Sequence, residues 1–243
     1  MSSIGIEQLR GIHAGRLCFI AGAGPSLRHL SPEQAAPHIL IAVNSSINKF
    51  PNAQYMFSCD PGITIHNSWQ LAKSLTCKII IAQPEGTIEG FGAYDDKRGD
   101  SFCNGIAGRI VNVGRKVDEY SHAFNRSDKT LIFGQSSAHC ACHMAFLMGC
   151  SPIVLVGCDC GVEDGKRFYF DYNDQKQWRD QLVDPKLSRY FSRETDILAG
   201  FVNGWDRIGH DNPNVKILNC GNAILPAVQP AKLKDVLEGR YPD

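Results

Sequence analysis

Leu17-Cys18-Phe19-Ile20-Ala21-Gly22-Ala23-Gly24-Pro25-Ser26-Leu27 is the stretch of sequence that decides the fold. An apolar run passes here directly into a glycine-rich turn, and a hydroxyl residue follows where a helix would begin. Gly22 and Gly24 carry no side chain that would keep the backbone away from a ligand. The helix expected after Ser26 would present unpaired N–H groups to an anion. The stretch predicts a strand, a phosphate-binding turn and a helix. An ordinary strand-to-helix turn is the alternative, because short glycine motifs recur by chance.

The composition is that of a soluble globular protein. The chain has 243 residues, 43% of them hydrophobic, with 25 basic and 25 acidic side chains. This length suits one large domain, or one domain with a substantial lid. The zero formal charge argues against a broad nucleic-acid or membrane surface, so the expected ligand is small. No apolar stretch reaches the roughly 20 residues that cross a bilayer, and no secretion signal precedes the first strand. We expect a cytoplasmic protein, and association with a second copy of the chain stays open.

The ten cysteines are expected to be reduced thiols, because no secretion signal accompanies them. One cluster, His139-Cys140-Ala141-Cys142-His143, has two histidines one helical turn apart that could share a metal ion. Cys140 and Cys142 would point to nearly opposite sides of that helix, and no second pair of cysteines completes a tetrahedral site. We therefore predict buried structural cysteines rather than a zinc site.

Short β-rich runs alternate with helix-like stretches, a pattern typical of an α/β fold with a mainly parallel central sheet and helices on both faces. The core is expected over residues 1–159, with an irregular insertion at about 84–130 that contains a weak strand candidate at 109–113. Residues 160–214 are rich in aromatic side chains and predict a lid, with a packed helical hairpin as the alternative. Residues 215–243 would add the last core strand and a C-terminal turn or helix. The predicted strands are 16–22, 38–44, 55–60, 78–83, 153–159 and 215–220, and the predicted helices are 31–36, 65–74, 136–148 and 195–205.

Polar or small residues follow most of the predicted strands. Gly22, Asn44, Asp60, Gln83 and Asp159 each lie at or just beyond a strand's carboxyl end, and so does the segment 219–222. The carboxyl ends of parallel strands share one edge of a sheet, where ligands of open α/β proteins bind. We therefore expect these side chains to converge on one site. The alternative is that each strand simply ends in a polar turn.

These motifs occur in an order that resembles the motility-accessory-factor and bacterial sialyltransferase-like proteins, some of them encoded by phages. The resemblance begins with Gly22-Ala23-Gly24-Pro25-Ser26-Leu27 and includes Ala42-Val43-Asn44 and Phe57-Ser58-Cys59-Asp60-Pro61. It continues with Gln135-Ser136-Ser137 ahead of a helix and with the Gly157-Cys158-Asp159 strand end, and Asn219-Cys220-Gly221-Asn222 takes the place of a closing turn. It covers most of the chain.

The resemblance implies a modified Rossmann-like fold that binds a cytidine nucleotide sugar. It implies that the phosphate is faced by Gly22, Ala23, Gly24, Pro25, Ser26, Ser136 and Ser137, and that Asn44, Gly157 and Asn222 line the nucleotide or sugar. We also expect Gln135 and Cys158 to bind the nucleotide or substrate, and Tyr169 and Tyr172 to reach the site from the lid. Asp60, Asp159 and Glu194 are the candidate catalytic carboxylates. No cofactor is certain, but Asp60 could hold a divalent cation such as magnesium.

Two departures from the sialyltransferase pattern bear on mechanism. The family's general-base histidine before a Thr-Asp pair has no counterpart in Tyr190-Phe191-Ser192-Arg193-Glu194, and Cys160-Gly161-Val162 lacks the family's tyrosine. Our leading hypothesis is a nucleotide-sugar-dependent glycosyltransferase with a CMP-sialic-acid-like (nonulosonate) donor. The first alternative is a magnesium-dependent phosphoryl-transfer enzyme of the 6-hydroxymethylpterin diphosphokinase-like type, with Asp60 and Asp159 as metal ligands. A catalytically inactive nucleotide-binding accessory protein is the second.

Overall fold

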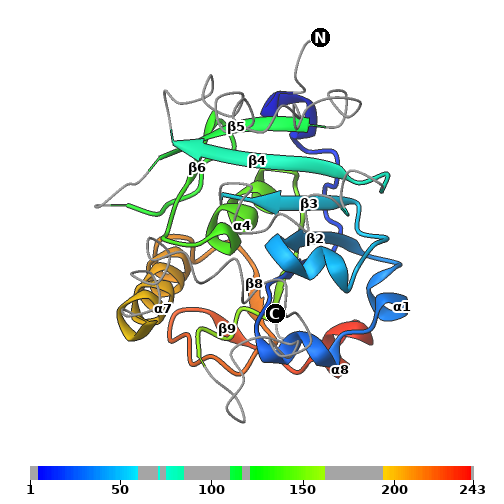
Figure 1. Ribbon diagram of the computed structural model, residues 1–243. Coiled ribbons are helices and arrows are strands. Elements are labelled where there is room, and N and C mark those ends of the chain that lie inside the picture. Colours follow the sequence, from blue (N-terminus) through cyan, green and yellow to red (C-terminus); the bar gives the residue numbers. More distant parts are fainter. Residues whose placement is uncertain are drawn as a thin grey trace, which may run out of the picture.

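A parallel β-sheet forms the centre of the protein in a computed structural model that describes residues 5–59, 71, 75–84, 110–116, 121–161 and 194–241 (Figure 1). The described residues contribute nine strands in the order β6-β5-β4-β3-β2-β1-β7-β8-β9, and each pair of neighbours is parallel. The predicted α/β class is confirmed. The strands are β1 Cys18–Ala21, β2 Ile39–Val43, β3 Tyr55–Ser58, β4 Lys78–Pro84, β5 Ile110–Lys116, β6 Thr130–Ile132, β7 Ile153–Val156, β8 Ile217–Asn219 and β9 Gln229–Pro230.

The central strands are uninterrupted apolar runs because both of their faces are covered. Every residue of β1, β2 and β7 is buried, as expected for parallel strands between two layers of helices. All six predicted strands are confirmed, and the weak candidate at 109–113 corresponds to β5. The sequence analysis missed β6 and β9, which have three and two residues and are too short for a periodic pattern.

The helical elements that follow β1 differ from the prediction. The helix expected after Ser26 is a 3₁₀ helix, η2, of only five residues, Pro25–His29, and no side chain caps it. A second short helix, α1 Pro32–Ala35, follows. The side chains of Ser31 and Gln34 form a capping box at its start. The helix that directly follows the glycine turn is therefore too short to direct a substantial dipole at it. The other helices are η1 Ile6–Leu9, η3 Asn44–Asn48, α4 Ser137–Leu147, α7 Glu194–Asp211 and α8 Leu233–Leu237.

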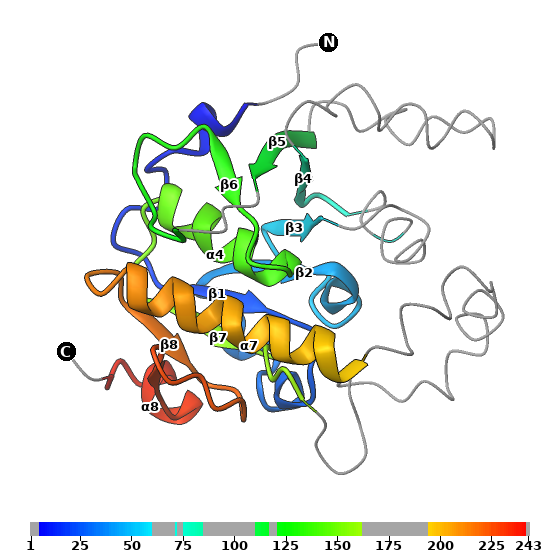
Figure 2. The ribbon, with the colours of Figure 1, turned by 90° about the vertical axis from the view of Figure 1, so that its left-hand side faces the viewer.

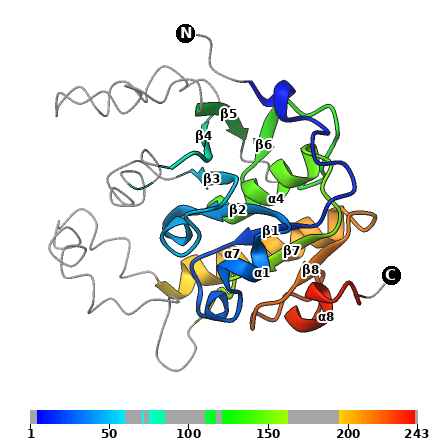
Figure 3. The same cartoon turned by 90° about the vertical axis from the view of Figure 1, so that its right-hand side faces the viewer.

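Helices cover both faces of the sheet. On one face α4 and α7 lie against the strands (Figure 2), and ten of the eleven residues of α4 are buried. On the other face, η2, η3 and α8 enclose a second apolar cluster with Phe19 and Met56 (Figure 3). Trp205, which the sequence analysis assigned to the lid, is 1% exposed and belongs to the core beneath α7. Its large apolar ring packs inside the core, 4.4 Å from the ring of His139 on α4.

Several predicted features lie outside the described residues. These are the helix at 65–74 apart from Leu71, most of the insertion, the lid residues 162–193, and the individual residues Asp60, Tyr169 and Tyr172. Within the described ranges, none of the helices combines the length and the apolar character needed to cross a bilayer.

Candidate functional site

The strand order reverses between β1 and β7, and this reversal marks the expected ligand site. From β1 to β6 the chain moves toward one edge of the sheet, and from β7 to β9 it moves toward the other. Ligands of open α/β sheets bind outside the carboxyl ends of the strands at such a switch point. The glycine turn follows β1 and the Gly157–Asp159 segment follows β7 (Figure 3), so two motifs separated by more than 130 residues meet there.

The glycines allow the two strand ends to approach each other closely. The N–H of Gly22 donates to the carbonyl of Val156 at 2.8 Å, and that of Gly24 donates to the carbonyl of Gly157 at 2.8 Å. A Cβ atom on Gly22 would lie 2.2 Å from the Gly157 oxygen, and Gly157 itself has a φ of +72°. Only glycine fits at these positions. The turn therefore brings backbone against backbone, and two of its N–H groups are used inside the protein.

Asp159 ties three strand ends together. Its Oδ2 accepts the N–H of Ser26 at 2.8 Å and its Oδ1 accepts the N–H of Asn222 at 2.9 Å. The Ser26 hydroxyl in turn accepts the N–H of Gly157 at 2.9 Å. Asp159 is 8% exposed and Ser26 only 2%. The carboxylate thus holds the loops after β1, β7 and β8 in one arrangement, through hydrogen bonds of the charge-assisted kind.

Ala23 is the part of the glycine turn that stays accessible. Ala23 and Gly24 are half-buried, whereas Pro25 and Ser26 are buried. Among the described residues, the N–H of Ala23 has no hydrogen-bond acceptor, whereas those of Gly22, Gly24 and Ser26 have one each. One N–H group of the predicted phosphate turn is therefore available to a ligand.

The ends of β2 and β3 lie at the same edge. Asn44 has a left-handed φ of +54° and begins η3 directly after β2. The Ser46 hydroxyl donates to the carbonyl of Ala21 at 2.7 Å, which ties the end of β2 to that of β1. Cys59, directly after β3, donates its N–H to the Ser137 hydroxyl at 3.0 Å. The described ends of β1, β2, β3, β7 and β8 therefore lie at one edge of the sheet, and hydrogen bonds join those of β1, β7 and β8. That the predicted side chains bind one ligand there stays a prediction.

The segment 135–137 forms the start of α4 at this edge. Ser136 caps the helix by accepting the N–H of His139 at 3.3 Å, and Ser137 is buried beneath the end of β3. Gln135 is exposed and has a left-handed φ of +77°. It lies against Gly200 of α7, where a Cβ atom would be 2.0 Å from the Gln135 Oε1. Both hydroxyls therefore have backbone partners, and Gln135 is the exposed side chain of the three.

Other predicted residues contribute less to the edge or are not described. The Cys158 thiol faces the core at 4.0 Å from the carbonyl of Ile20, and burial raises its pKa well above the usual range. It is not a ligand-facing group. Glu194 begins α7, but its side chain lies outside the described part, as do all atoms of Asp60, Tyr169 and Tyr172.

The histidines of α4 are structural, and the zinc alternative finds no support in the described part. The ring of His139 packs 4.4 Å from that of Trp205, and burial lowers the pKa of His139 to about 3. His143 accepts the N–H of Ile132 at 3.0 Å and lies 3.1 Å from the carboxylate of Asp128. The described residues contain no group of three metal-ligating side chains. Cys140 and Cys142 are buried thiols, as predicted, and that of Cys140 lies 3.3 Å from the carbonyl of Ile132.

Two features of the site were missed from the sequence. Asp159 accepts N–H groups from Ser26 and Asn222, which lie 133 and 63 residues from it in the sequence. No pattern in the sequence near Asp159 predicts these bonds. The close packing of α7 does have a signal, the pair Gly200 and Gly204, because residues four apart share a helix face and small residues there permit a close approach. A Cβ atom on Gly204 would lie 2.3 Å from the carbonyl of Gly134.

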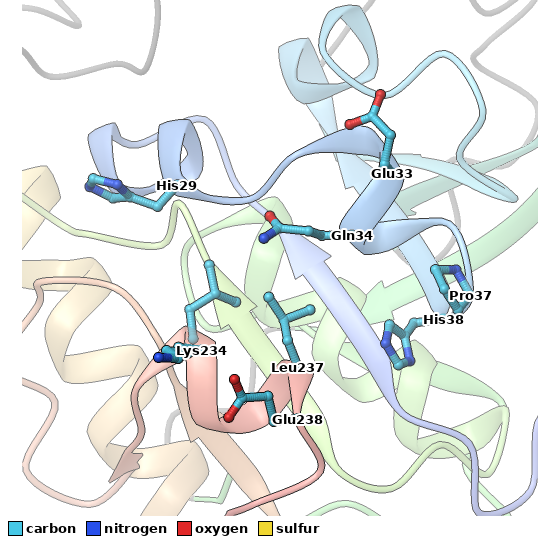
Figure 4. Close-up of a pocket in the computed structure, with 9 residues that line it drawn as sticks. His29, Glu33, Gln34, Pro37, His38, Lys234, Leu237 and Glu238 are labelled. Carbon is cyan, nitrogen blue, oxygen red and sulfur yellow. The ribbon is translucent and has the colours of Figure 1, made fainter.

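A separate open groove of about 580 Å³ lies between α1 and α8, away from the switch point (Figure 4). Gln34 and Glu33 come from α1, and Lys234, Leu237 and Glu238 come from α8 or its end. None of these residues takes part in the contacts between the strand ends described above. The chemistry of the switch point therefore does not extend to this groove.

Comparisons with known proteins relate the chain to one family and one fold. A family model described as "6-hydroxymethylpterin diphosphokinase MptE-like" matches residues 4–165. The structure of the MAf glycosyltransferase from Magnetospirillum magneticum AMB-1 is similar with a TM-score of 0.53 and 13% sequence identity, over 93% of this chain and 37% of that chain. This chain thus spans little more than a third of that protein, and at this identity the likeness concerns the fold. No curated protein matches the sequence.

Proposed function

The chain belongs to the 6-hydroxymethylpterin diphosphokinase MptE-like family, and within that family we propose that it acts as a nucleotide-sugar-dependent glycosyltransferase. The observation that carries the proposal is the set of hydrogen bonds joining the ends of β1, β7 and β8 at the switch point. They join these strand ends at the edge where open α/β sheets bind their ligands. The fold likeness to a glycosyltransferase supports the same reading.

The donor in this proposal is a cytidine nucleotide joined to an acidic nonulosonate sugar. Its phosphate would lie beside the N–H of Ala23 and the positive end of the α4 dipole, which starts at Ser137. These groups would stabilise the charge that develops on the leaving phosphate. Asn222, at the end of β8, would border the base, and Asn44, at the end of β2, would border the sugar.

The reaction needs a base for the acceptor hydroxyl. The acceptor oxygen would form the new bond to the anomeric carbon while the bond from that carbon to the nucleotide phosphate breaks, and the hydroxyl proton would pass to a carboxylate. Asp159 already accepts two backbone N–H groups, so we assign it a positioning role. Asp60 and Glu194 are then the candidate bases. Asp60 directly follows Cys59, whose N–H contacts the start of α4.

A magnesium-dependent diphosphokinase is the second candidate, and the description of the matching family favours it. Such chemistry needs oxygen ligands for a hard cation. The described residues offer no group of three suitable side chains, and each oxygen of Asp159 already accepts an N–H. These residues do not fit a metal site, so we derive no step through a metal ion.

Ligand binding separates the two candidates. We would measure thermal unfolding and calorimetric binding with CMP, with CMP-N-acetylneuraminic acid, and with ATP in the presence and absence of magnesium. A ligand at about one hundred times its Kd stabilises by roughly 2.7 kcal/mol, which raises the Tm of a chain of this size by roughly 5–10 °C. Stabilisation by the cytidine ligands without magnesium, with CMP released when an acceptor is added, supports the glycosyltransferase. Binding of ATP only with magnesium supports the diphosphokinase.

Asp60→Ala tests the predicted site. Loss of the candidate base should abolish turnover by this variant while leaving its unfolding in urea close to that of the wild type. Asp235→Ala, which removes an exposed carboxylate paired with Arg240 at 2.9 Å, is the matched control and should keep wild-type activity. Wild-type turnover by Asp60→Ala would exclude Asp60 from the site. Binding without turnover in the wild type would favour the accessory role.

A further inference from the structure

Arg115 on β5 is a partly buried arginine whose hydrogen-bonding capacity the described protein does not use. Its guanidinium carbon lies 3.9 Å above the centre of the Phe133 ring. Its Nε is buried and has no hydrogen-bond partner among the described residues. A buried donor without an acceptor costs stability, and native proteins rarely keep one without a reason. Arginines commonly stack on aromatic faces and use the N–H edge of the guanidinium to bind planar anions.

The register of the sheet places Arg115 beyond the end of β3. Ser58, the last residue of β3, is paired with Ile81 of β4, whereas Arg115 is paired with Pro84. The strands β4 and β5 therefore run three residues past β3, a distance of about 10 Å. They form a wall at the carboxyl edge of the sheet, which is the edge that carries the candidate site.

Arg115 faces the α4 side of that wall. Val113, two residues earlier on the same strand, belongs to the core cluster that contains the α4 side chains, and residues two apart on a strand share a face. Phe133 follows β6 and precedes Ser136, the N-cap of α4, by three residues. Figure 2 shows β5, β6 and α4 side by side. The guanidinium is thus held close to the start of α4, on the ligand-binding edge.

Arg126 provides an internal comparison. Its guanidinium carbon lies 4.0 Å above the ring of Phe146, which is nearly the same stacking distance. Arg126 also donates to the carbonyl of Phe146, so its stacked geometry is completed by a bond inside the protein. Arg115 has the stacking without such a bond. The difference indicates that the acceptor for Arg115 comes from outside the described chain.

We propose that Arg115 binds an oxyanion of the substrate, a carboxylate or a phosphate, at the end of the site farthest from the switch point. The identity of that substrate rests on the proposed function. Four strand spacings separate β5 from β1, or about 19 Å, so a nucleotide at β1 and β7 leaves the sugar or the acceptor near Arg115. The carboxylate of an acidic sugar matches the two-pronged donor edge of a guanidinium.

The first test uses small anions and reads Arg115 directly. In a ¹⁵N spectrum, the Arg115 Nε–H signal is identified as the one lost in Arg115→Gln. We expect this signal to shift on titration with N-acetylneuraminic acid and to stay in place with its uncharged methyl ester. A shift with inorganic phosphate alone assigns the phosphate as the recognised group. No shift with either anion overturns the proposal, whether or not any nucleotide binds.

The second test uses the nucleotide donor and the matched variants. Hydrogen bonds to charged groups contribute about 1.5–3 kcal/mol, so Arg115→Gln should weaken CMP-N-acetylneuraminic acid about tenfold to hundredfold and leave the Kd of CMP unchanged. Arg115→Lys should recover part of the loss, because it keeps the charge without the fork. Arg126→Gln should lower the Tm and leave both affinities unchanged. An equal loss of affinity for CMP in Arg115→Gln, or a lowered Tm without any change in affinity, overturns the proposal. If the wild type binds neither cytidine ligand, the proposed function fails and the anion titration alone decides the role of Arg115.

Discussion

Glycine at two positions allows the carboxyl ends of β1 and β7 to lie close together. At Gly22 a Cβ atom would meet the Gly157 oxygen at 2.2 Å, and at Gly24 it would meet the Asp159 carboxylate at 2.4 Å. Glycine at a strand end is compatible with a close ligand or with a close backbone, and the sequence does not distinguish the two. The turn was predictable from its residues. Its main partner was not, because Gly157 and Asp159 are remote in the chain.

Gly22→Ala should destabilise the protein by about 1–3 kcal/mol or more, because the added methyl group collides with backbone that cannot rotate away. The matched control is Gly161→Ala in the neighbouring loop, where the nearest atom to the new Cβ would be 3.6 Å away. That change should be neutral or slightly stabilising, since alanine restricts the unfolded chain. Urea unfolding compares the two variants. Equal midpoints for both would contradict the close contact between the strand ends.

The buried His139 makes stability sensitive to acid. Its pKa is lowered to about 3 by burial, whereas the unfolded value is near 6.5. Between these values the unfolded chain binds a proton that the folded chain does not, so stability falls as the pH drops below about 6.5, by up to about 1.4 kcal/mol per pH unit. In His139→Gln, the free energy of unfolding should depend less steeply on pH between 4 and 6.5, because unfolding would take up one proton fewer. The same slope in both proteins would show that His139 is not the group responsible.

At the scale of elements, α7 illustrates what periodicity can and cannot predict. The sequence predicted a helix over 195–205, and the structure extends it from Glu194 to Asp211. Ile208 is fully buried and continues the apolar face that includes Trp205, so packing carries the helix past the predicted end. The strand cores were predictable because their apolar runs are continuous. The length of η2 was not, because a five-residue 3₁₀ helix is decided by the loops around it.

Gly204→Ala should destabilise the protein, although a helical glycine replaced by alanine usually makes a protein more stable. Replacing a glycine inside a helix by alanine normally stabilises by about 1 kcal/mol. Here the new Cβ would lie 2.3 Å from the carbonyl of Gly134 and 2.5 Å from Cε1 of His139. We expect a net loss of about 1–3 kcal/mol, because α7 must move off α4.

The adjacent position supplies the control for that prediction. Asn203 is exposed on the same helix, so Asn203→Ala should stabilise by about 0.5 kcal/mol. Thermal unfolding of both variants gives the comparison. A stabilised Gly204→Ala would show that α7 does not pack against the 134–139 segment as described.

At the scale of the molecule, the topology decides which strand ends can form a site. The order of motifs along the chain was sufficient to predict a parallel sheet, helices on both faces and a shared carboxyl edge. The position of the order reversal was not stated from the sequence, because strand order depends on long-range pairing. The hydrogen bonds of Asp159 also join residues far apart in the chain and could not be predicted from the sequence. They show that a carboxylate expected to take part in catalysis also holds the strand ends together.

Removal of the Asp159 carboxylate should affect stability and ligand binding together. Asp159→Ala leaves the buried N–H of Ser26 without an acceptor, which should cost about 1–3 kcal/mol, whereas the N–H of the exposed Asn222 can bond to water instead. Asp159→Asn keeps one acceptor oxygen but directs an amide N–H toward the other donor, so its loss should be intermediate. Urea unfolding and calorimetric binding of CMP measure the two effects. A fully stable Asp159→Ala protein that has lost only turnover would assign Asp159 to the chemistry instead of to positioning.

The hydrogen bond between Ser26 and Gly157 joins residues 131 positions apart, and this separation governs when the candidate site can form. A growing polypeptide completes the glycine turn early, but the turn meets its partners only after the segment following β7 has been added. Contacts between such distant residues form slowly, because a long loop must close first. A nascent chain that stops before Asp159 would therefore contain every residue of the first strand and turn and would still lack the bonds that hold the candidate site together.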